Sequence, residues 1–198
     1  MGDNMVQLIH NIIEYLENII LNNNIFISLL VGFLIVVLES ILPFLPLAVF
    51  IAINKLVFGN VVGFLISWIG TITGCVIAFM IFRKGFSDKL YKHIKKDKYK
   101  DLMDKISNIS YTALVMITAL PFTAAFAVNI AAGLSKISFK KFLAAVVVAK
   151  ISIVYFWGYI GTSFIESITN VWIFIRTLLI MIIVYGISKI VSIKFNIK

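Results

Sequence analysis

One stretch of the sequence places polar and charged side chains inside strongly hydrophobic surroundings. Residues 39–59 read ESILPFLPLAVFIAINKLVFG, with a carboxylate at Glu39, an amide at Asn54 and an ammonium group at Lys55. An ionisable group at membrane depth is costly, so it usually faces a protein interior or a watery cavity. Glu39 is therefore the first candidate for function, as a protonation switch, as a ligand for an amine headgroup or as half of an ion pair.

A second stretch repeats several features of the first. Within residues 109–134, an apolar run is broken by Pro121, Asn129 follows, and Gly133 comes shortly after. The tripeptide Leu-Pro-Phe occurs at both 42–44 and 120–122. These shared features indicate a weak internal repeat, with Asn129 as the counterpart of Asn54.

The three prolines interrupt both stretches. Pro43, Pro46 and Pro121 each lack a backbone donor and break a helical ladder. In a bilayer, a broken backbone is tolerated only where protein or trapped water satisfies the freed groups. We therefore predict two re-entrant helical hairpins, at about 39–58 and 109–134, and give the prolines a structural role that makes the site possible. A proline-kinked spanning helix is the alternative for the first stretch.

Lys150 is the natural partner for Glu39 by elimination, because it lies deep within the apolar run 142–164. Such a buried pair would be mostly structural, since desolvation can cancel its Coulomb attraction. We expect Lys55 to extend its long side chain to the outer surface. Asn54 and Asn129 are expected to cap the broken helices or to line the cavity.

Composition sets the class of the protein. The 198 residues are 61% hydrophobic and 14% charged, whereas soluble domains are about half apolar and a quarter charged. We predict an all-α integral membrane protein with an amphipathic surface helix over 1–24, a membrane domain over 25–165, and a transmembrane helix with a short basic tail over 166–198. Glycines spaced by four, Gly59/Gly63 and Gly70/Gly74, are expected to lie on helical faces that pack closely.

The net charge of +9 gives the expected topology. Lysines concentrate in a loop over 83–107, so the positive-inside rule places this loop and both termini in the cytoplasm of a multi-pass cell-membrane protein. The second hairpin would then enter from the cytoplasm and the first from the opposite side, as in known transporters. Anionic lipid headgroups explain the basic loop better than nucleic acid does.

The sequence predicts no enzyme, metal or cofactor. His10, His93 and the single Cys75 do not have metal-ligand spacing. There is no G-x-S-x-G, H-E-x-x-H or phosphate-binding glycine loop.

The order of these motifs resembles that of the DedA/VTT family, also called SNARE-associated Golgi proteins, over roughly residues 30–165. The matching residues are Glu39, Pro43-x-x-Pro46, Phe58-Gly59, Gly70-x-x-x-Gly74 and Arg83-x-Gly85, then Pro121, Asn129-x-x-x-Gly133-Leu134-Ser135, Phe139-x-x-Phe142 and Tyr159-x-Gly161. The resemblance implies two opposed re-entrant hairpins and movement of lipids between leaflets. It is closer to the VTT type than to the proton-dependent DedA type.

Four positions depart from the family pattern. Thr118 stands where members often carry an arginine, Leu47 and Ala48 stand where proton-dependent members carry a second acid, and Cys75 stands where an aspartate often follows the glycine.

We therefore expect a lipid transporter or scramblase that moves phospholipid or polyprenyl-phosphate headgroups. The alternatives are a proton- or ion-coupled small-solute carrier and a non-transporting membrane scaffold. The expected partners are membrane lipids, with anionic headgroups near the basic loop, and a homo-oligomer stays open. The candidate transport residues are Glu39, Pro43, Pro46, Asn54, Pro121, Asn129, Gly133 and Lys150.

Overall fold

The computed structural model describes residues 24–42, 47–86, 104, 107–122, 125–167 and 170–194. The elements in these residues are all helical: α2 (Ile25–Ile41), α3 (Leu47–Ile81), the π-helical turn η1 (Phe82–Phe86), α6 (Tyr111–Ala119), α7 (Ala125–Leu134), α8 (Phe139–Ser167) and α9 (Val171–Lys194). Within these residues, three stretches are long and apolar enough to cross a membrane: Leu47–Lys84, Phe139–Phe164 and Val171–Val191. The prediction of an all-α membrane protein is confirmed. The predicted surface helix over 1–24, Pro43, Pro46 and most of the basic loop lie outside the described residues.

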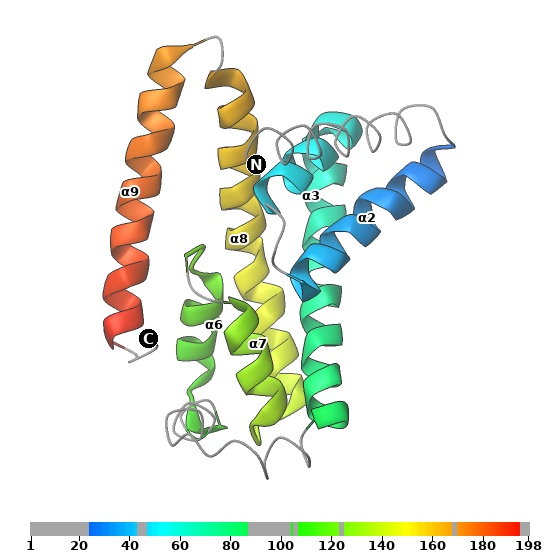
Figure 1. Ribbon diagram of the computed structural model, residues 1–198, viewed down its shortest axis with the longest axis vertical. Helices are drawn as coiled ribbons and strands as arrows, with labels where there is room; N and C mark the ends of the chain where they lie inside the picture. The colour runs from blue at the N-terminus through cyan, green and yellow to red at the C-terminus, as the bar shows by residue number, and fades with distance from the viewer. Residues whose placement is uncertain are drawn as a thin grey trace, which may run out of the picture.

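The first helical pair is formed by α2 and the beginning of α3. The Asn24 side chain accepts a hydrogen bond from the backbone N–H of Phe26 at 3.2 Å, which caps the start of α2. α2 ends at Ile41, and the chain returns as residues 47–58 of α3. In Figure 1, α2 and the beginning of α3 lie in the upper half of the molecule. The described part of this pair runs from Ile25 to Ile41 and from Leu47 to Phe58. The re-entrant hairpin over 39–58 stays a prediction.

Gly59 divides α3 into the returning arm and a long helix over 60–81. Its backbone has φ 78° and ψ 168°, a conformation that is essentially restricted to glycine. The sequence-based assignment of Gly59 to a helical face with Gly63 is therefore wrong, because the helix breaks at this residue. Gly59 reverses the chain, and the backbone at Gly63 then packs directly against the Asn54–Lys55 peptide.

The second helical pair is formed by α6 and α7. The Ser110 hydroxyl accepts from the N–H of Ala113 at 3.2 Å and caps α6. α6 ends at Ala119, and Leu120 is extended with φ −84° and ψ 125°, because a residue before proline is pushed out of the helical region. Figure 1 shows this pair in the lower half, turning toward the middle from the end opposite to the first pair.

The long helices α8 and α9 run antiparallel beside the two pairs (Figure 1). Close approach depends on glycine: a Cβ at Gly74 would lie 2.5 Å from Ser40 Cβ of α2, and one at Gly161 of α8 would overlap the Ala48 carbonyl. The prediction that Gly70 and Gly74 permit tight helix packing is confirmed, since both face α2. The buried core joins α3, α6, α7 and α8 around the stacked rings of Phe79 and Phe142, whose centroids lie 4.4 Å apart.

Candidate functional site

The structure brings two buried charges from distant parts of the chain into electrostatic contact. Glu39, in the last turn of α2, is 7% exposed, and Lys150, in the middle of α8, is 5% exposed. The Coulomb attraction of Lys150 acts on the Glu39 carboxylate. Within the described residues, neither group has a hydrogen bond or a direct ion pair. Glu39 and Lys150 thus attract each other without forming a salt bridge, so the carboxylate and the ammonium group can each still bind another partner.

Three more polar atoms are buried around the ends of the two helical pairs. Ser40 Oγ follows Glu39 in α2, Thr118 Oγ1 lies in the last turn of α6, and Asn129 Oδ1 lies in α7. None of them has a hydrogen-bond partner among the described residues. Leaving a buried acceptor or donor unpaired costs about 1–3 kcal/mol, so such atoms usually mark a place for water or a ligand. Sequence reasoning missed Ser40, although it is adjacent to Glu39.

Asn54 closes the first helical pair. Its Nδ2 donates to the Gly32 carbonyl of α2 at 3.2 Å and to the Ser67 hydroxyl of the long part of α3 at 3.0 Å. The Asn54 Oδ1 also sits so close to Gly32 that no Cβ fits there. These contacts hold α2 and the two parts of α3 together, and a role for Asn54 in transport stays a prediction.

Asn129 links α7 to α3 through Cys75. Its Nδ2 donates to Cys75 Sγ at 3.2 Å, and both side chains are buried. One turn later, a Cβ at Gly133 would lie 2.7 Å from the Phe79 carbonyl and 2.9 Å from Phe82 Cβ. Gly133 is therefore a packing position between α7 and α3, while Asn129 keeps an unpartnered oxygen.

Arg83 holds the end of α7, a contact that the sequence did not reveal. Its guanidinium donates to the carbonyls of Gly133 (2.7 Å), Ala132 (3.0 Å) and Ile137 (2.9 Å). The last carbonyls of a helix have no partner within the helix, and a cation is favourable at this end of the helix dipole. The only available signal was the place of Arg83 in the Arg83-x-Gly85 motif.

Pro121 precedes an aromatic residue, Phe122, that attaches the turn after α6 to the long helices. The next residue, Phe122, contacts Phe156 and Trp157 of α8 and Tyr185 of α9, with ring centroids 5.7–6.0 Å apart and edge-on geometry. Such aromatic contacts contribute about 0.5–1.5 kcal/mol each beyond burial. The turn that Pro121 begins is thus attached to both long helices. The counterpart prolines Pro43 and Pro46 lie outside the described residues.

Lys55 packs along α8. A Cβ at Gly158 would lie 3.1 Å from Lys55 Cδ and 3.6 Å from its Nζ, and the side chain is half-buried. The Lys55 side chain therefore passes Gly158 of α8, and we expect it to continue from there toward the outer surface.

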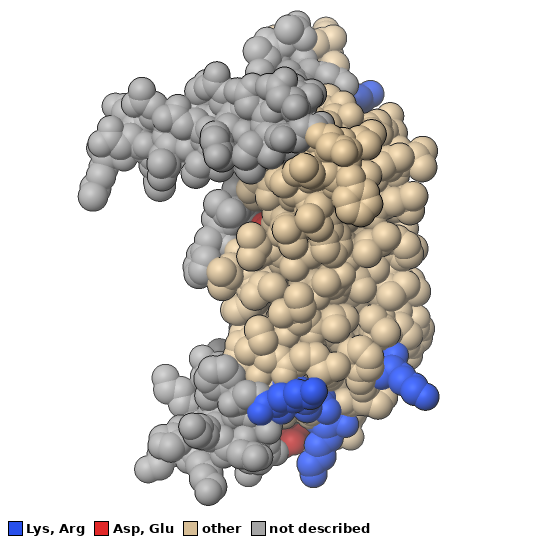
Figure 2. Space-filling model, turned by 90° about the vertical axis from the view of Figure 1, so that its right-hand side faces the viewer, with Lys and Arg blue, Asp and Glu red and all other residues tan. Residues whose placement is uncertain are grey.

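Charge is distributed unevenly along the molecule. Figure 2 shows most of the lysine and arginine side chains on that face at its lower end. Exposed lysines near the start of α8 include Lys136 and Lys140. In the described ranges, no three His, Cys, Asp or Glu side chains gather as a metal site would require.

The chain matches the VTT domain family over residues 42–163. It is 31% identical to the uncharacterized membrane protein YhjE of Bacillus subtilis over 156 residues, covering 78% of this chain and 74% of YhjE. It is 24% identical to the uncharacterized protein YqeD of the same organism over 161 residues, covering 80% and 77% of the two chains. No solved structure gives a significant match. The resemblance drawn from the sequence is thus confirmed, and the chain belongs to the VTT domain family, also called DedA, of membrane proteins.

Proposed function

We propose that this protein moves lipid headgroups between the two leaflets of a membrane. The observation that carries the proposal is the burial of Glu39 and Lys150, neither with a direct partner among the described residues, in a chain whose two helical pairs lie in opposite halves of the molecule (Figure 1). Ionisable groups inside a membrane protein are costly, and they typically mark a substrate or ion pathway.

The two helical pairs are proposed to be re-entrant hairpins. Each would open a polar path through half of the bilayer, and opposed broken helices near the midplane are a known transporter arrangement. A phosphate group could accept hydrogen bonds from the Lys150 ammonium and the Thr118 hydroxyl, whereas an amine headgroup could donate to Glu39. The Asn129 oxygen, which lacks a partner in the described residues, would be a further acceptor.

The wider setting is proposed to be the cell membrane, with the basic end in the cytoplasm. The exposed lysines at this end would contact anionic headgroups, each worth about 1 kcal/mol near such a surface. Transport would need no covalent chemistry from the protein. Nothing in the proposal depends on whether the chain acts as a monomer or a homo-oligomer.

Leaflet exchange in liposomes tests the proposal. A fluorescent phospholipid and a fluorescent polyprenyl phosphate would be followed with wild-type protein, with Glu39→Gln and with Asp104→Asn, which changes an exposed acid. We expect exchange with wild type and Asp104→Asn and a loss of at least about tenfold with Glu39→Gln, as for a lost charged contact. Exchange no faster than in protein-free liposomes, with or without a pH gradient, would refute lipid transport and leave the scaffold alternative.

A proton- or ion-coupled carrier is a second candidate, favoured by the Glu39 carboxylate, which has no hydrogen bond within the described residues. It predicts that solute uptake into proteoliposomes depends on a pH or ion gradient. Uptake unchanged by ionophores would exclude this coupling.

A further inference from the structure

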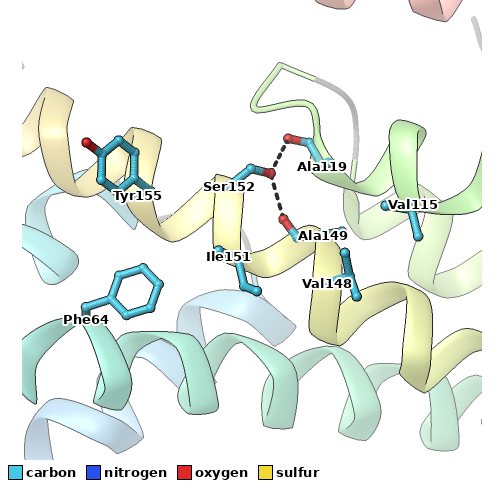
Figure 3. A pocket seen from close by; sticks show the side chains of 8 residues that line it. All are labelled: Phe64, Val115, Ala119, Val148, Ala149, Ile151, Ser152 and Tyr155. Atoms are coloured by element: carbon cyan, nitrogen blue, oxygen red, sulfur yellow. Dashed lines mark hydrogen bonds between the residues drawn. The ribbon is translucent and has the colours of Figure 1, made fainter. Parts of the chain in front are cut away.

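An apolar groove opens on the side of the molecule between α3, α6 and α8. Its volume is about 570 Å³, within the range of about 300–1,000 Å³ that is common for ligand pockets. Phe64 of α3 lies on one side, Val115 and Ala119 of α6 lie on another, and Val148, Ser152 and Tyr155 of α8 line the floor (Figure 3).

The groove lies in the middle of two candidate membrane spans, and this position determines what surrounds its opening. Residues 148–155 are the middle of the Phe139–Phe164 span, and Phe64 belongs to the Leu47–Lys84 span. Val148 is 47% exposed and Tyr155 is 70% exposed, so the groove is open on the outer face of these spans. In the proposed membrane setting, the middle of a span lies within the hydrocarbon core, so the groove faces lipid tails.

The wall behind the groove separates it from the buried polar atoms. Ser152 Oγ donates to the Ala119 carbonyl at 3.2 Å and to the Ala149 carbonyl at 2.9 Å, and so joins the end of α6 to α8 (Figure 3). The neighbouring residues Thr118 and Lys150 are buried, whereas Ala119 and Ile151 line the groove. The same turns of α6 and α8 therefore present apolar side chains to the groove and polar ones to the interior.

We infer that this groove binds the hydrocarbon tail of a membrane lipid, next to the buried polar groups of α6 and α8 that are proposed to handle headgroups. The inference rests on the proposed lipid transport and adds the place of the tail. An amphiphile needs an apolar and a polar compartment side by side, and the Ala119–Ser152 contact is where the two compartments adjoin. The occupant is an acyl or polyprenyl chain, because the groove offers only the Ser152 and Tyr155 hydroxyls as polar side-chain groups.

Photolabelling of the wild-type protein tests the binding of the tail directly. The protein would be placed in phosphatidylcholine vesicles with a trace of phosphatidylcholine that carries a diazirine in one tail, and labelled residues would be mapped by mass spectrometry. We expect several-fold more label on Val148 and its groove neighbours than on Leu179 of α9, which has a similar exposure of 54% against 47%. Equal labelling of the two surfaces, as for bulk lipid, would overturn the inference.

Two tryptophan variants connect the groove with transport. Val148→Trp fills the groove, and Leu179→Trp adds the same bulk to an exposed apolar position outside it. We expect Val148→Trp to lose groove labelling and most of the leaflet exchange, while Leu179→Trp keeps both. Exchange at the wild-type rate in a folded Val148→Trp protein would overturn the inference while leaving lipid transport intact. Strong groove labelling without any wild-type exchange would support the groove and refute the proposed function.

Discussion

Glu39 and Lys150 are 111 positions apart in the sequence, yet each lowers the cost of burying the other. A charge removed from water loses several kcal/mol of solvation, and an opposite charge nearby returns part of this loss. Because the two groups are not in direct contact, the attraction is weaker than in a closed salt bridge and leaves room for a headgroup to compete.

The electrostatic link between these residues can be measured with a double-mutant cycle. We expect Glu39→Gln and Lys150→Met each to lower the melting temperature in detergent, because each leaves the other group uncompensated. The double variant should recover part of the loss, with a coupling of about 1 kcal/mol, as for residues in one network. The matched pair Glu39→Gln with Lys136→Met, which changes an exposed lysine, should be additive. Additive losses in both pairs would show that Lys150 does not stabilise Glu39.

Among the elements, each helical pair depends on a residue outside it, which is Arg83 for the second pair and Gly59 for the first. α7 is only ten residues long, and isolated helices shorter than about 12–15 residues are marginal in water. Arg83 donates two hydrogen bonds to its end and a third to Ile137, just beyond it, and the guanidinium also lies over the Phe79 ring, 4.7 Å from its centroid. The second helical pair is thereby attached to the end of α3.

Arg83→Ala should destabilise the end of α7, because three carbonyls lose a charged donor. We expect a loss of about 1.5–3 kcal/mol, the range for a hydrogen bond to a charged group. Arg83→Lys should give an intermediate loss, since an ammonium lacks the planar fork. Thermal melting and hydrogen exchange of α7 amides report the effect. Lys84→Ala, at an exposed neighbour, is the control, and an equal effect of the two alanine variants would contradict the capping role.

Gly59 has a comparable role in the first pair, through its backbone alone. An added Cβ would meet nothing within 4 Å, so any cost of Gly59→Ala comes from the conformation with φ 78°. We expect a loss of about 1–3 kcal/mol, the cost of a strained backbone conformation. Gly186→Ala is the matched control, because it also has open space but no positive φ, and it should be neutral or slightly stabilising. A Gly59→Ala protein with the same melting temperature as Gly186→Ala would contradict the strain.

At the scale of the whole molecule, the long helices α8 and α9 define two ends. Both match candidate spans and run antiparallel in Figure 1. Lys136 precedes the start of α8 and Asn170 follows its end, so these two residues lie at opposite ends of this helix. The lysine-rich end is the one that the positive-inside rule assigns to the cytoplasm.

Cysteine labelling in intact cells tests this orientation. In a Cys75→Ser background, Asn170→Cys should react with a membrane-impermeant maleimide added outside, whereas Lys136→Cys should react only after permeabilisation. Both positions are exposed in the structure, so access to the reagent decides the result. The reverse pattern would overturn the assignment of the basic end to the cytoplasm.

The local features of this protein follow from its sequence alone. Its apolar composition predicted helices in a membrane, the residue before Pro121 marked the end of α6, and lysine placement gave one basic end. These features depend on short-range effects, namely the conformational limits of proline and the solvation of side chains. The limit of local reasoning appears at Gly59, where four-residue spacing suggested a helical face but the chain reverses.

Only the tertiary structure decided which of these features come together. That Arg83 would cap α7 and that Asn129 would face Cys75 depend on which helix packs beside which. The sequence predicted Lys150 as the partner of Glu39, but only the structure shows that the two attract each other without a direct ion pair. The groove likewise exists only because α3, α6 and α8 leave space between them. Helix neighbours are fixed by glycine contacts and ring packing between residues far apart in the chain, and no local pattern contains that information.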